Sequence, residues 1–188
     1  MSTRILILYG TSYGQTAKVA RYITDCLTRS GFVVRLVHAD QLPAGLSPRE
    51  VDGVLIGASV IVGRHQRSVR RFVTEHRDEL NAMPSAFFSV SGSAGSHEEQ
   101  GTIDAQRCID EFLGVTGWRP ALTESVAGAM AFTKYNPFIR WVLKQISKRN
   151  GGPTDTSCDH ELTDWPEVEQ FAGAFMTMVN GGTAASVL

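Results

Sequence analysis

Short apolar runs alternate with amphipathic stretches along most of the 188-residue chain. The runs have the length and composition of strands that are buried on both faces of a parallel sheet. They predict strands at 5–9, 33–37, 53–58, 86–90 and 125–131. Apolar residues between them recur at helical spacing, which predicts helices at 15–29, 69–80, 103–113 and 168–179. Strands that alternate with helices form right-handed βαβ units, so the pattern predicts an α/β protein with a doubly wound, five-stranded parallel sheet.

The junction between the first strand and the first helix is the strongest candidate for chemistry. Residues 4–16 read RILILYGTSYGQT, an apolar run that stops at a glycine before a helix begins near Gln15. Such a junction directs free backbone N–H groups and the positive end of the helix dipole at one point, which makes an anion site. The hydroxyls of Thr11, Ser12 and Thr16, with no cation nearby, suit a phosphate that anchors a cofactor. The same residues would also serve as an ordinary helix cap and turn.

Three other phosphate-handling motifs are excluded by the residues at this junction. A Walker A loop needs four residues between its glycines and a lysine after them, whereas three residues separate Gly10 from Gly14 and no lysine follows. The dinucleotide pattern G-x-G-x-x-G is absent here. A response-regulator receiver needs acidic residues after its first strand and an aspartate ending its third, where this chain has Tyr9–Gly10 and Ala58–Ser59.

The string GTSYGQT resembles the phosphate loop of flavodoxins, whose pattern is roughly [ST]-x-x-G-x-T. The resemblance implies a flavodoxin-like strand order 2-1-3-4-5, with the ligand crevice at the carboxyl ends of strands 1 and 3. Tyr13 stands where flavodoxins usually have Thr. By this resemblance, the phosphate of FMN is surrounded by Thr11, Ser12, Tyr13, Gly14, Gln15 and Thr16.

If FMN binds there, the loops after the third and fourth strands must hold its ring. They read GASVIVGRHQ at 57–66 and SVSGSAGSH at 89–97, and both are rich in small residues that let the backbone approach a planar ring closely. Ordinary exposed loops can have the same composition. The residues expected to border the ring are Ser59, Val60, Ile61 and Gly63 on one edge and Ser91, Gly92 and Ser93 on the other.

Arg64, His65 and Arg67 follow the first of these loops. A cation near a flavin would stabilise its anionic reduced form or attract a substrate that carries carboxylates. His65 could move protons near neutral pH. Arg64 and His65 are therefore candidate catalytic residues, although all three side chains would also suit a solvated helix start.

Composition sets wider limits. Apolar residues make up 43% of the chain and charged residues 20%, as in soluble globular proteins, and the net charge of −1 argues against a general nucleic-acid binder. The three cysteines are dispersed, so we expect a reducing setting, no disulfide framework and no metal site. No signal peptide or spanning segment is evident, which predicts a cytoplasmic protein, or one attached to the inner face of the membrane only at its surface. We expect one domain at 1–180 and a frayed tail at 181–188.

An insert at 133–164 separates the last strand from the last helix. Its centre at 137–149 reads PFIRWVLKQISKR, which predicts a helix with Arg140, Lys144 and Lys148 in one row and an aromatic, apolar remainder. A basic amphipathic helix of this kind can lie on an anionic bilayer. It could equally pack on the core with its cations in water.

Several further strings carry a more specific resemblance. They are GAS at 57–59, MPSAFFSV at 83–90, WRP at 118–120, AGA at 127–129, GGPTDT at 151–156 and TDW at 163–165. With the phosphate loop and the insert, they make the chain similar to the FMN- and quinone-dependent protoporphyrinogen oxidases of bacterial haem synthesis. That resemblance implies that FMN takes hydrogen from protoporphyrinogen IX and passes electrons to a membrane quinone of the menaquinone type. The residues expected to contact substrate or membrane are Arg67, Lys134, Arg140, Trp141, Lys144 and Lys148.

Three alternatives stay open at this point. The first is a flavodoxin-type electron carrier, although carriers usually have strongly acidic surfaces and this chain is nearly neutral. The second is a flavodoxin-like NAD(P)H:quinone reductase. The third is an interaction module of the same fold that has lost its flavin.

Overall fold

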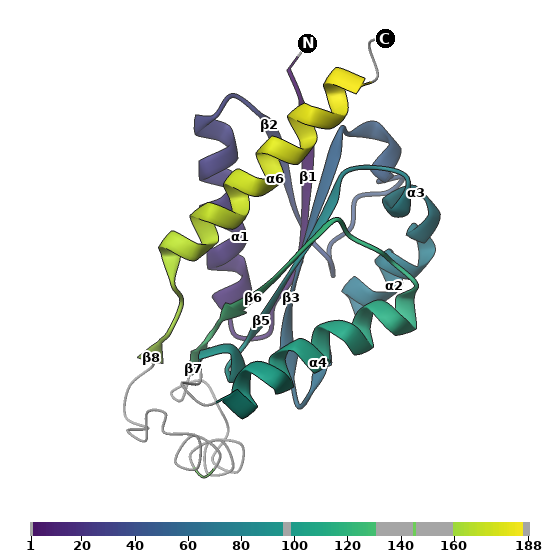
Figure 1. Ribbon diagram of the computed structural model, residues 1–188. Helices are drawn as coiled ribbons and strands as arrows, with labels where there is room; N and C mark the ends of the chain where they lie inside the picture. The colour runs from purple at the N-terminus through teal and green to yellow at the C-terminus, as the bar shows by residue number, and fades with distance from the viewer. Residues whose placement is uncertain (1, 96–98, 131–144, 146–159, 186–188) are drawn as a thin grey trace.

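The computed structural model describes residues 2–95, 99–130, 145 and 160–185, and it contains a central parallel sheet (Figure 1). Five strands lie in the order β2-β1-β3-β5-β6 and pair in parallel throughout. Since β5 and β6 are the fourth and fifth long strands along the chain, this is the predicted order 2-1-3-4-5. The strands are β1 (Arg4–Gly10), β2 (Val33–His38), β3 (Gly53–Ile61), β5 (Ser85–Ser91) and β6 (Leu122–Ala127).

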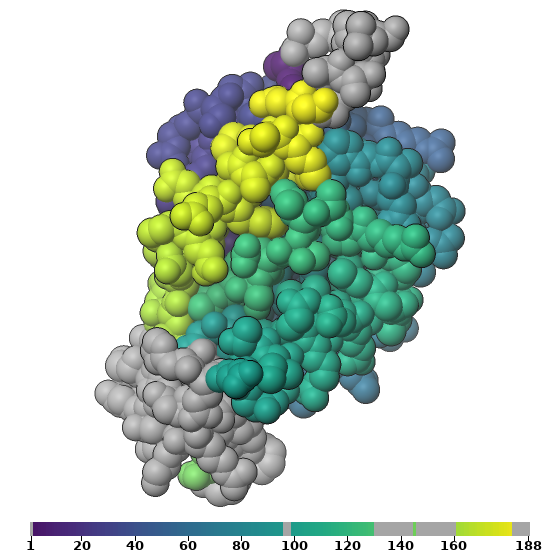
Figure 2. Space-filling model, viewed as in Figure 1, coloured from purple at the N-terminus to yellow at the C-terminus, as the bar shows by residue number. Residues whose placement is uncertain are grey.

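Helices cover both faces of the sheet (Figure 1). One face carries α1 (Gln15–Arg29) and α6 (Trp165–Ala185), which pack against each other. The other carries α2 (Arg67–Glu75), α3 (Arg77–Asn81) and α4 (Glu99–Thr116). Figure 2 shows the surface between α6 and α4, where the edge strand β6 lies. Two short 3-10 turns, Pro48–Glu50 and Ser93–Gly95, lie in the connections between these elements.

Strand β1 shows why an unbroken apolar run predicts a central strand. Its residues 5–8 are all fully buried. Because successive side chains point to opposite faces, Ile5 and Ile7 pack in the core under α1 and α6, whereas Leu6 and Leu8 pack in the core under α2 and α4. Both faces of the strand therefore need apolar residues, which removes the alternation expected of a half-exposed strand.

Several predicted elements have different bounds in the structure, and local features explain two of the differences. The helix predicted at 69–80 is two helices, because the backbone at His76 leaves the helical region (φ −109°, ψ 18°) between α2 and α3. The strand predicted at 125–131 begins earlier, as β6, and ends at Ala127. The predicted start was too late because Thr123 and Glu124 are polar and interrupt the apolar run. An edge strand such as β6 tolerates polar residues at these positions.

The chain leaves the sheet at Gly128, whose backbone N–H donates to the Ser91 carbonyl at 2.9 Å. After this break, β7 (Ala129–Met130) pairs with β8 (His160–Glu161) in a separate antiparallel ribbon. Helix α6 is longer at both ends than the predicted 168–179, and it includes residues 181–185 that the sequence assigned to a tail. Most of the predicted insert at 133–164 lies outside the described residues.

Strand β3 extends beyond the sheet as a hairpin. Its last residues pair with β4 (Arg64–His65) in antiparallel register, Val60 opposite His65 and Ile61 opposite Arg64. The turn between them has positive φ at both positions, 49° at Val62 and 72° at Gly63. The hairpin therefore projects from the carboxyl edge of the sheet, where a ligand crevice is expected in folds of this topology.

Candidate functional site

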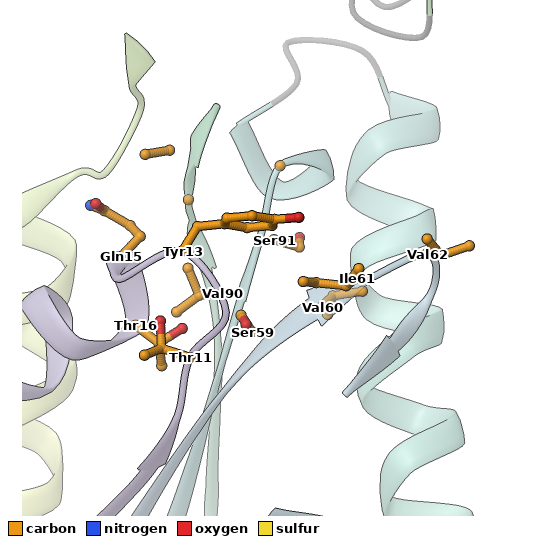
Figure 3. A pocket seen from close by; sticks show the side chains of 13 residues that line it. Thr11, Tyr13, Gln15, Thr16, Ser59, Val60, Ile61, Val62, Val90 and Ser91 are labelled. Carbon is orange, nitrogen blue, oxygen red and sulfur yellow. The ribbon is translucent and has the colours of Figure 1, made fainter. Parts of the chain in front are cut away.

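A cleft of about 810 Å³, counting its open mouth, lies at the carboxyl ends of β1, β3 and β5 (Figure 3). Residues from four separate segments form its lining, and nine of the thirteen are residues that the sequence predicted. The lining consists of Thr11, Tyr13, Gln15, Thr16, Ser59, Val60, Ile61, Val62, Val90, Ser91, Gly92, Gly128 and Ala129.

The loop between β1 and α1 has the geometry of an anion site. Gly14 precedes the helix in the left-handed conformation (φ 97°), which residues with a side chain rarely adopt. Its N–H donates to the Thr11 hydroxyl at 2.9 Å, which closes the turn. Among the described residues no side chain caps α1, and no acidic residue lies in its first turn. The helix N–H groups and the positive end of the helix dipole are thus available to an anionic ligand.

Thr16 provides the clearest sign that a ligand belongs here. Its side chain is fully buried, yet its hydroxyl has no hydrogen-bond partner among the described residues. A buried hydroxyl without a partner costs roughly 1 to 3 kcal/mol, and such groups are rare in folded proteins. The hydroxyl lies in the first helical turn and lines the cleft. An acceptor bound in the cleft would supply the missing hydrogen bond.

Gln15 lines the cleft, but its amide points away from it (Figure 3). The amide nitrogen donates to Thr163 Oγ1 at 2.8 Å and to Glu161 Oε1 at 3.2 Å. Thr163 in turn donates to the Ala127 carbonyl at 2.7 Å. The Gln15 side chain therefore fastens the start of α1 to β8 and the end of β6, and a direct side-chain contact with phosphate stays a prediction.

The other side of the cleft is mainly apolar and is formed by the ends of β3 and β5. Val60 and Ile61 line it from β3, and Val90 lines it from β5. Tyr13 brings an aromatic ring from the phosphate-loop side, and Figure 3 shows this ring reaching across toward Ser91. Apolar walls with small polar groups at one end suit a flat heteroaromatic ring attached to a phosphate.

Gln66 connects the two sides of the cleft, and sequence reasoning missed it. Its amide nitrogen donates to Ser12 Oγ at 3.2 Å and also forms a hydrogen bond with Ser59 Oγ. The side chain therefore ties the phosphate loop to the end of β3. Sequence reasoning also missed Gly128 and Ala129 as part of the lining. Both belong to the AGA string at 127–129, which the sequence analysis used only as a point of resemblance to the family.

Several predicted site residues do not line the cleft. Ser12 contacts Gln66, Gly14 shapes the turn, and Ser93 lies in the 3-10 turn after β5. The remaining four, Gly63, Arg64, His65 and Arg67, line a second cavity instead. The turn at Val62–Gly63 reverses the chain and pairs β4 with the end of β3, so Gly63, Arg64 and His65 line this second cavity. Their expected roles at the flavin stay predictions.

His65 has an environment that differs from the one expected of a proton shuttle. Its Nε2 and the Ser89 hydroxyl share a hydrogen bond of 2.9 Å, and its ring contacts Phe87 and Phe112 edge-on. Burial lowers the pKa of His65 to about 4. The imidazole is therefore neutral at neutral pH, and its expected role in moving protons stays a prediction.

This buried imidazole predicts a pH dependence of stability. Between pH 6.5 and 4 the unfolded chain binds a proton at His65 that the folded protein does not, so the free energy of unfolding should fall as the pH decreases through this window. The expected loss is about 2 to 3 kcal/mol. The direct contacts of His65 are uncharged, but Arg64, Arg67, Arg70 and Glu111 line the same cavity.

Urea unfolding of wild type and His65→Gln at several pH values isolates this contribution as a difference. The difference in unfolding free energy between the two proteins should shrink toward low pH, because the variant lacks the titrating ring. Parallel pH profiles for the two proteins would contradict a depressed pKa at His65.

The described residues contain no group of three or more His, Cys, Asp or Glu side chains placed to hold a metal ion. Among the helices described, none has the length and apolar character needed to cross a bilayer. Five residues expected to contact substrate or membrane lie outside the described residues: Lys134, Arg140, Trp141, Lys144 and Lys148.

Comparison with known proteins identifies the family. The flavodoxin domain family matches residues 6–157. Protoporphyrinogen IX dehydrogenase (quinone) of Escherichia coli K12 is 36% identical over 171 residues, which are 90% of this chain and 92% of that protein. The chain belongs to the flavodoxin-domain family of protoporphyrinogen IX dehydrogenases. A dehydrogenase of the same name from Leishmania major is 32% identical over 94% of this chain and 76% of its own length.

Solved structures of flavodoxins agree with this membership at the level of the fold. Oxidised flavodoxin 1 from Bacillus cereus superposes with a TM-score of 0.57 over 93% of this chain and 98% of its own, at 16% identity. An archaeal flavodoxin gives a TM-score of 0.54 at 15% identity, over 94% of this chain and 99% of its own. A flavodoxin domain implies a flavin cofactor, and the unpartnered Thr16 hydroxyl, the uncapped helix α1 and the apolar walls of the cleft fit one.

Proposed function

We propose that this protein oxidises protoporphyrinogen IX to protoporphyrin IX, with FMN as its cofactor and a quinone of the menaquinone type as the electron acceptor. The observation that carries the proposal is the 36% identity with the Escherichia coli dehydrogenase along 90% of the chain. The cleft supports the choice of cofactor, because it combines an anion site with apolar walls in one cavity.

The phosphate of FMN would lie at the start of α1. The hydroxyls of Thr11 and Thr16 and the first N–H groups of the helix would hold it, with Gly14 shaping the turn. The nearby cation Lys18 is paired with Glu161 at 3.0 Å, so neutral donors and the helix dipole would balance most of the charge. Such a site anchors a phosphate without activating it for transfer.

The flavin ring would lie between the ends of β3 and β5. Val60, Ile61 and Val90 would exclude water from it, while Ser59 and Ser91 would offer polar groups at its edges. When bound, FMN supplies the oxidant, accepting hydrogen from the substrate in repeated two-electron rounds and delivering the electrons to the quinone.

The chain itself would contribute anchorage and orientation to this chemistry. The described lining of the cleft includes no carboxylate, histidine or lysine. Each round moves two hydrogens from the substrate to the quinone overall, so a proton that leaves the substrate apart from the hydride is taken up again when the quinone is reduced. With no such base in the described lining, that proton would exchange with solvent at the open mouth of the cleft. The protein therefore acts by positioning the ring and excluding water, as is common in cofactor enzymes.

A turnover assay tests the proposal. Protein loaded with FMN should accelerate the appearance of porphyrin fluorescence from protoporphyrinogen IX under anaerobic conditions, and only when menaquinone or a soluble analogue is present. Protein stripped of FMN is the control. A rate equal to buffer would overturn the proposal, and bleaching of the flavin by NAD(P)H without porphyrinogen would favour a quinone reductase instead.

A further inference from the structure

A second cavity lies beside the flavin cleft, and three arginines line it. Arg64 comes from β4, and Arg67 and Arg70 come from α2. Phe112 and Val115 of α4 form its apolar part, and Glu111 adds a single carboxylate. We call this cavity the arginine groove. It has about 930 Å³ of empty space, counting its open side.

The charge in the arginine groove is not balanced by the described part of the chain. Three guanidiniums face one carboxylate, and none of the three forms an ion pair with a described carboxylate. The neighbouring Arg71 differs, since its guanidinium pairs with Glu75 at 4.0 Å. His65 also lines the groove, but burial lowers its pKa to about 4 and it is neutral at neutral pH.

Like charges gathered in one cavity repel each other, and among the described residues of the groove only the Glu111 carboxylate offsets that repulsion. An anionic ligand would offset the remaining repulsion between the arginines, and guanidinium groups bind carboxylates with paired, planar hydrogen bonds. The apolar part of the groove, including Val115 with 64% of its surface exposed, adds a preference for a ligand with a hydrocarbon portion next to its charge. The groove therefore suits an amphipathic carboxylic acid.

The position of the groove decides which carboxylic acid it suits. The hairpin of β3 and β4 separates the two cavities: Val60 and Ile61 line the flavin cleft, and their partners His65 and Arg64 line the groove. Neighbouring strands lie about 5 Å apart, so one strand width separates the cavities. That distance is smaller than the breadth of a tetrapyrrole. One such ligand can reach both cavities at once.

The tip of the hairpin supports this arrangement. Val62 lies at the turn, where its side chain is 94% exposed, and its φ of 49° is unusual for a β-branched residue. Figure 3 shows it beyond Ile61, at the outer end of the cleft. An exposed apolar side chain held in a strained backbone gains nothing from folding, and such strain concentrates at ligand sites. A flat apolar ring lying over the tip would cover it.

We infer that the arginine groove is the carboxylate subsite for the substrate, an inference that rests on the proposed function. The two propionates of the porphyrinogen contact Arg64, Arg67 and Arg70, and the macrocycle lies across Val62 with its edge toward the flavin cleft. The groove holds the substrate in register with the cofactor and discriminates against tetrapyrroles that lack free carboxylates.

The test uses full-length protein loaded with FMN and the double variant Arg67→Gln/Arg70→Gln. Both residues are exposed on α2, and glutamine keeps the helix propensity, so the variant should fold. Binding of protoporphyrin IX and of its dimethyl ester is measured by fluorescence titration, and turnover is measured with porphyrinogen. Arg71→Gln is the matched control, because its exposed pair with Glu75 contributes little to stability.

The double variant should bind the free acid at least tenfold more weakly, lose the preference over the dimethyl ester, and show a raised KM with kcat and FMN affinity nearly unchanged. Arg71→Gln should behave as wild type. An intact preference for the free acid in the double variant would overturn the subsite, and so would equal losses in Arg71→Gln.

Three further outcomes separate the subsite from the alternatives. If the double variant loses binding to vesicles of anionic phospholipid while porphyrin binding is intact, the groove serves a membrane and the subsite is wrong. If wild-type protein neither binds porphyrin nor turns over porphyrinogen, the proposed function fails, and the subsite fails with it. Wild-type turnover with an unaltered double variant rejects the subsite alone.

Discussion

Replacing Thr16 by valine should weaken FMN binding by about 10- to 100-fold while leaving the flavin-free protein at least as stable as wild type. The buried Thr16 hydroxyl has no partner among the described residues, so the flavin-free protein loses nothing when an apolar group of the same shape takes its place. Bound phosphate would lose one hydrogen bond to a charged group, worth about 1.5 to 3 kcal/mol.

Two measurements on the same proteins check this result: titration of flavin fluorescence for affinity, and urea unfolding without flavin for stability. Thr16→Ser keeps the hydroxyl and should retain most of the affinity. Thr24→Val is a matched control, because Thr24 lies on the same helix and its hydroxyl donates to the Ala20 carbonyl at 2.8 Å. Wild-type affinity in Thr16→Val would show that this hydroxyl does not meet the phosphate.

Substituting Gly57 by alanine should destabilise the protein by about 3 kcal/mol, although alanine normally improves a strand. An added Cβ at Gly57 would lie 2.0 Å from the ring of Phe88, which is fully buried on the neighbouring strand β5. The ring cannot move away without disturbing a core it shares with Phe171, whose ring centroid lies 6.4 Å away. Since Ser59 follows two residues later, flavin affinity should fall as well.

Urea unfolding gives the stability change, and Gly114→Ala serves as the control. A Cβ at Gly114, on α4, would meet nothing within 4 Å, so alanine there should stabilise the helix by up to about 1 kcal/mol. Equal effects of the two substitutions would show that close contact with Phe88 is not what requires glycine at position 57.

The phosphate loop around Thr16 could be predicted from the sequence, whereas the requirement for glycine at position 57 could not. The unbroken apolar run at 5–8 and the glycine turn after it are readable in the sequence, because a buried strand and a strand-to-helix turn are set by neighbouring residues. Thr16 was a predicted phosphate ligand on that basis. Its burial and its missing partner became visible only in the folded protein. The requirement for glycine at 57 depends on a phenylalanine thirty-one residues later, brought close by strand pairing.

The sequence by itself determined the class of fold and the position of the phosphate loop, since both follow from a local pattern of apolar runs, glycine and helical spacing. The strand order followed from the resemblance of the phosphate loop to that of flavodoxins. The tertiary structure decided which of the side chains after the end of β3 line the cleft and which line the second cavity. Gln66 ties Ser12 to Ser59, whereas His65 and Arg64 line the arginine groove, because the turn at Val62–Gly63 reverses the chain. A reversal of direction moves neighbours in sequence to opposite sides of a strand, and no local pattern reports on which side the ligand lies.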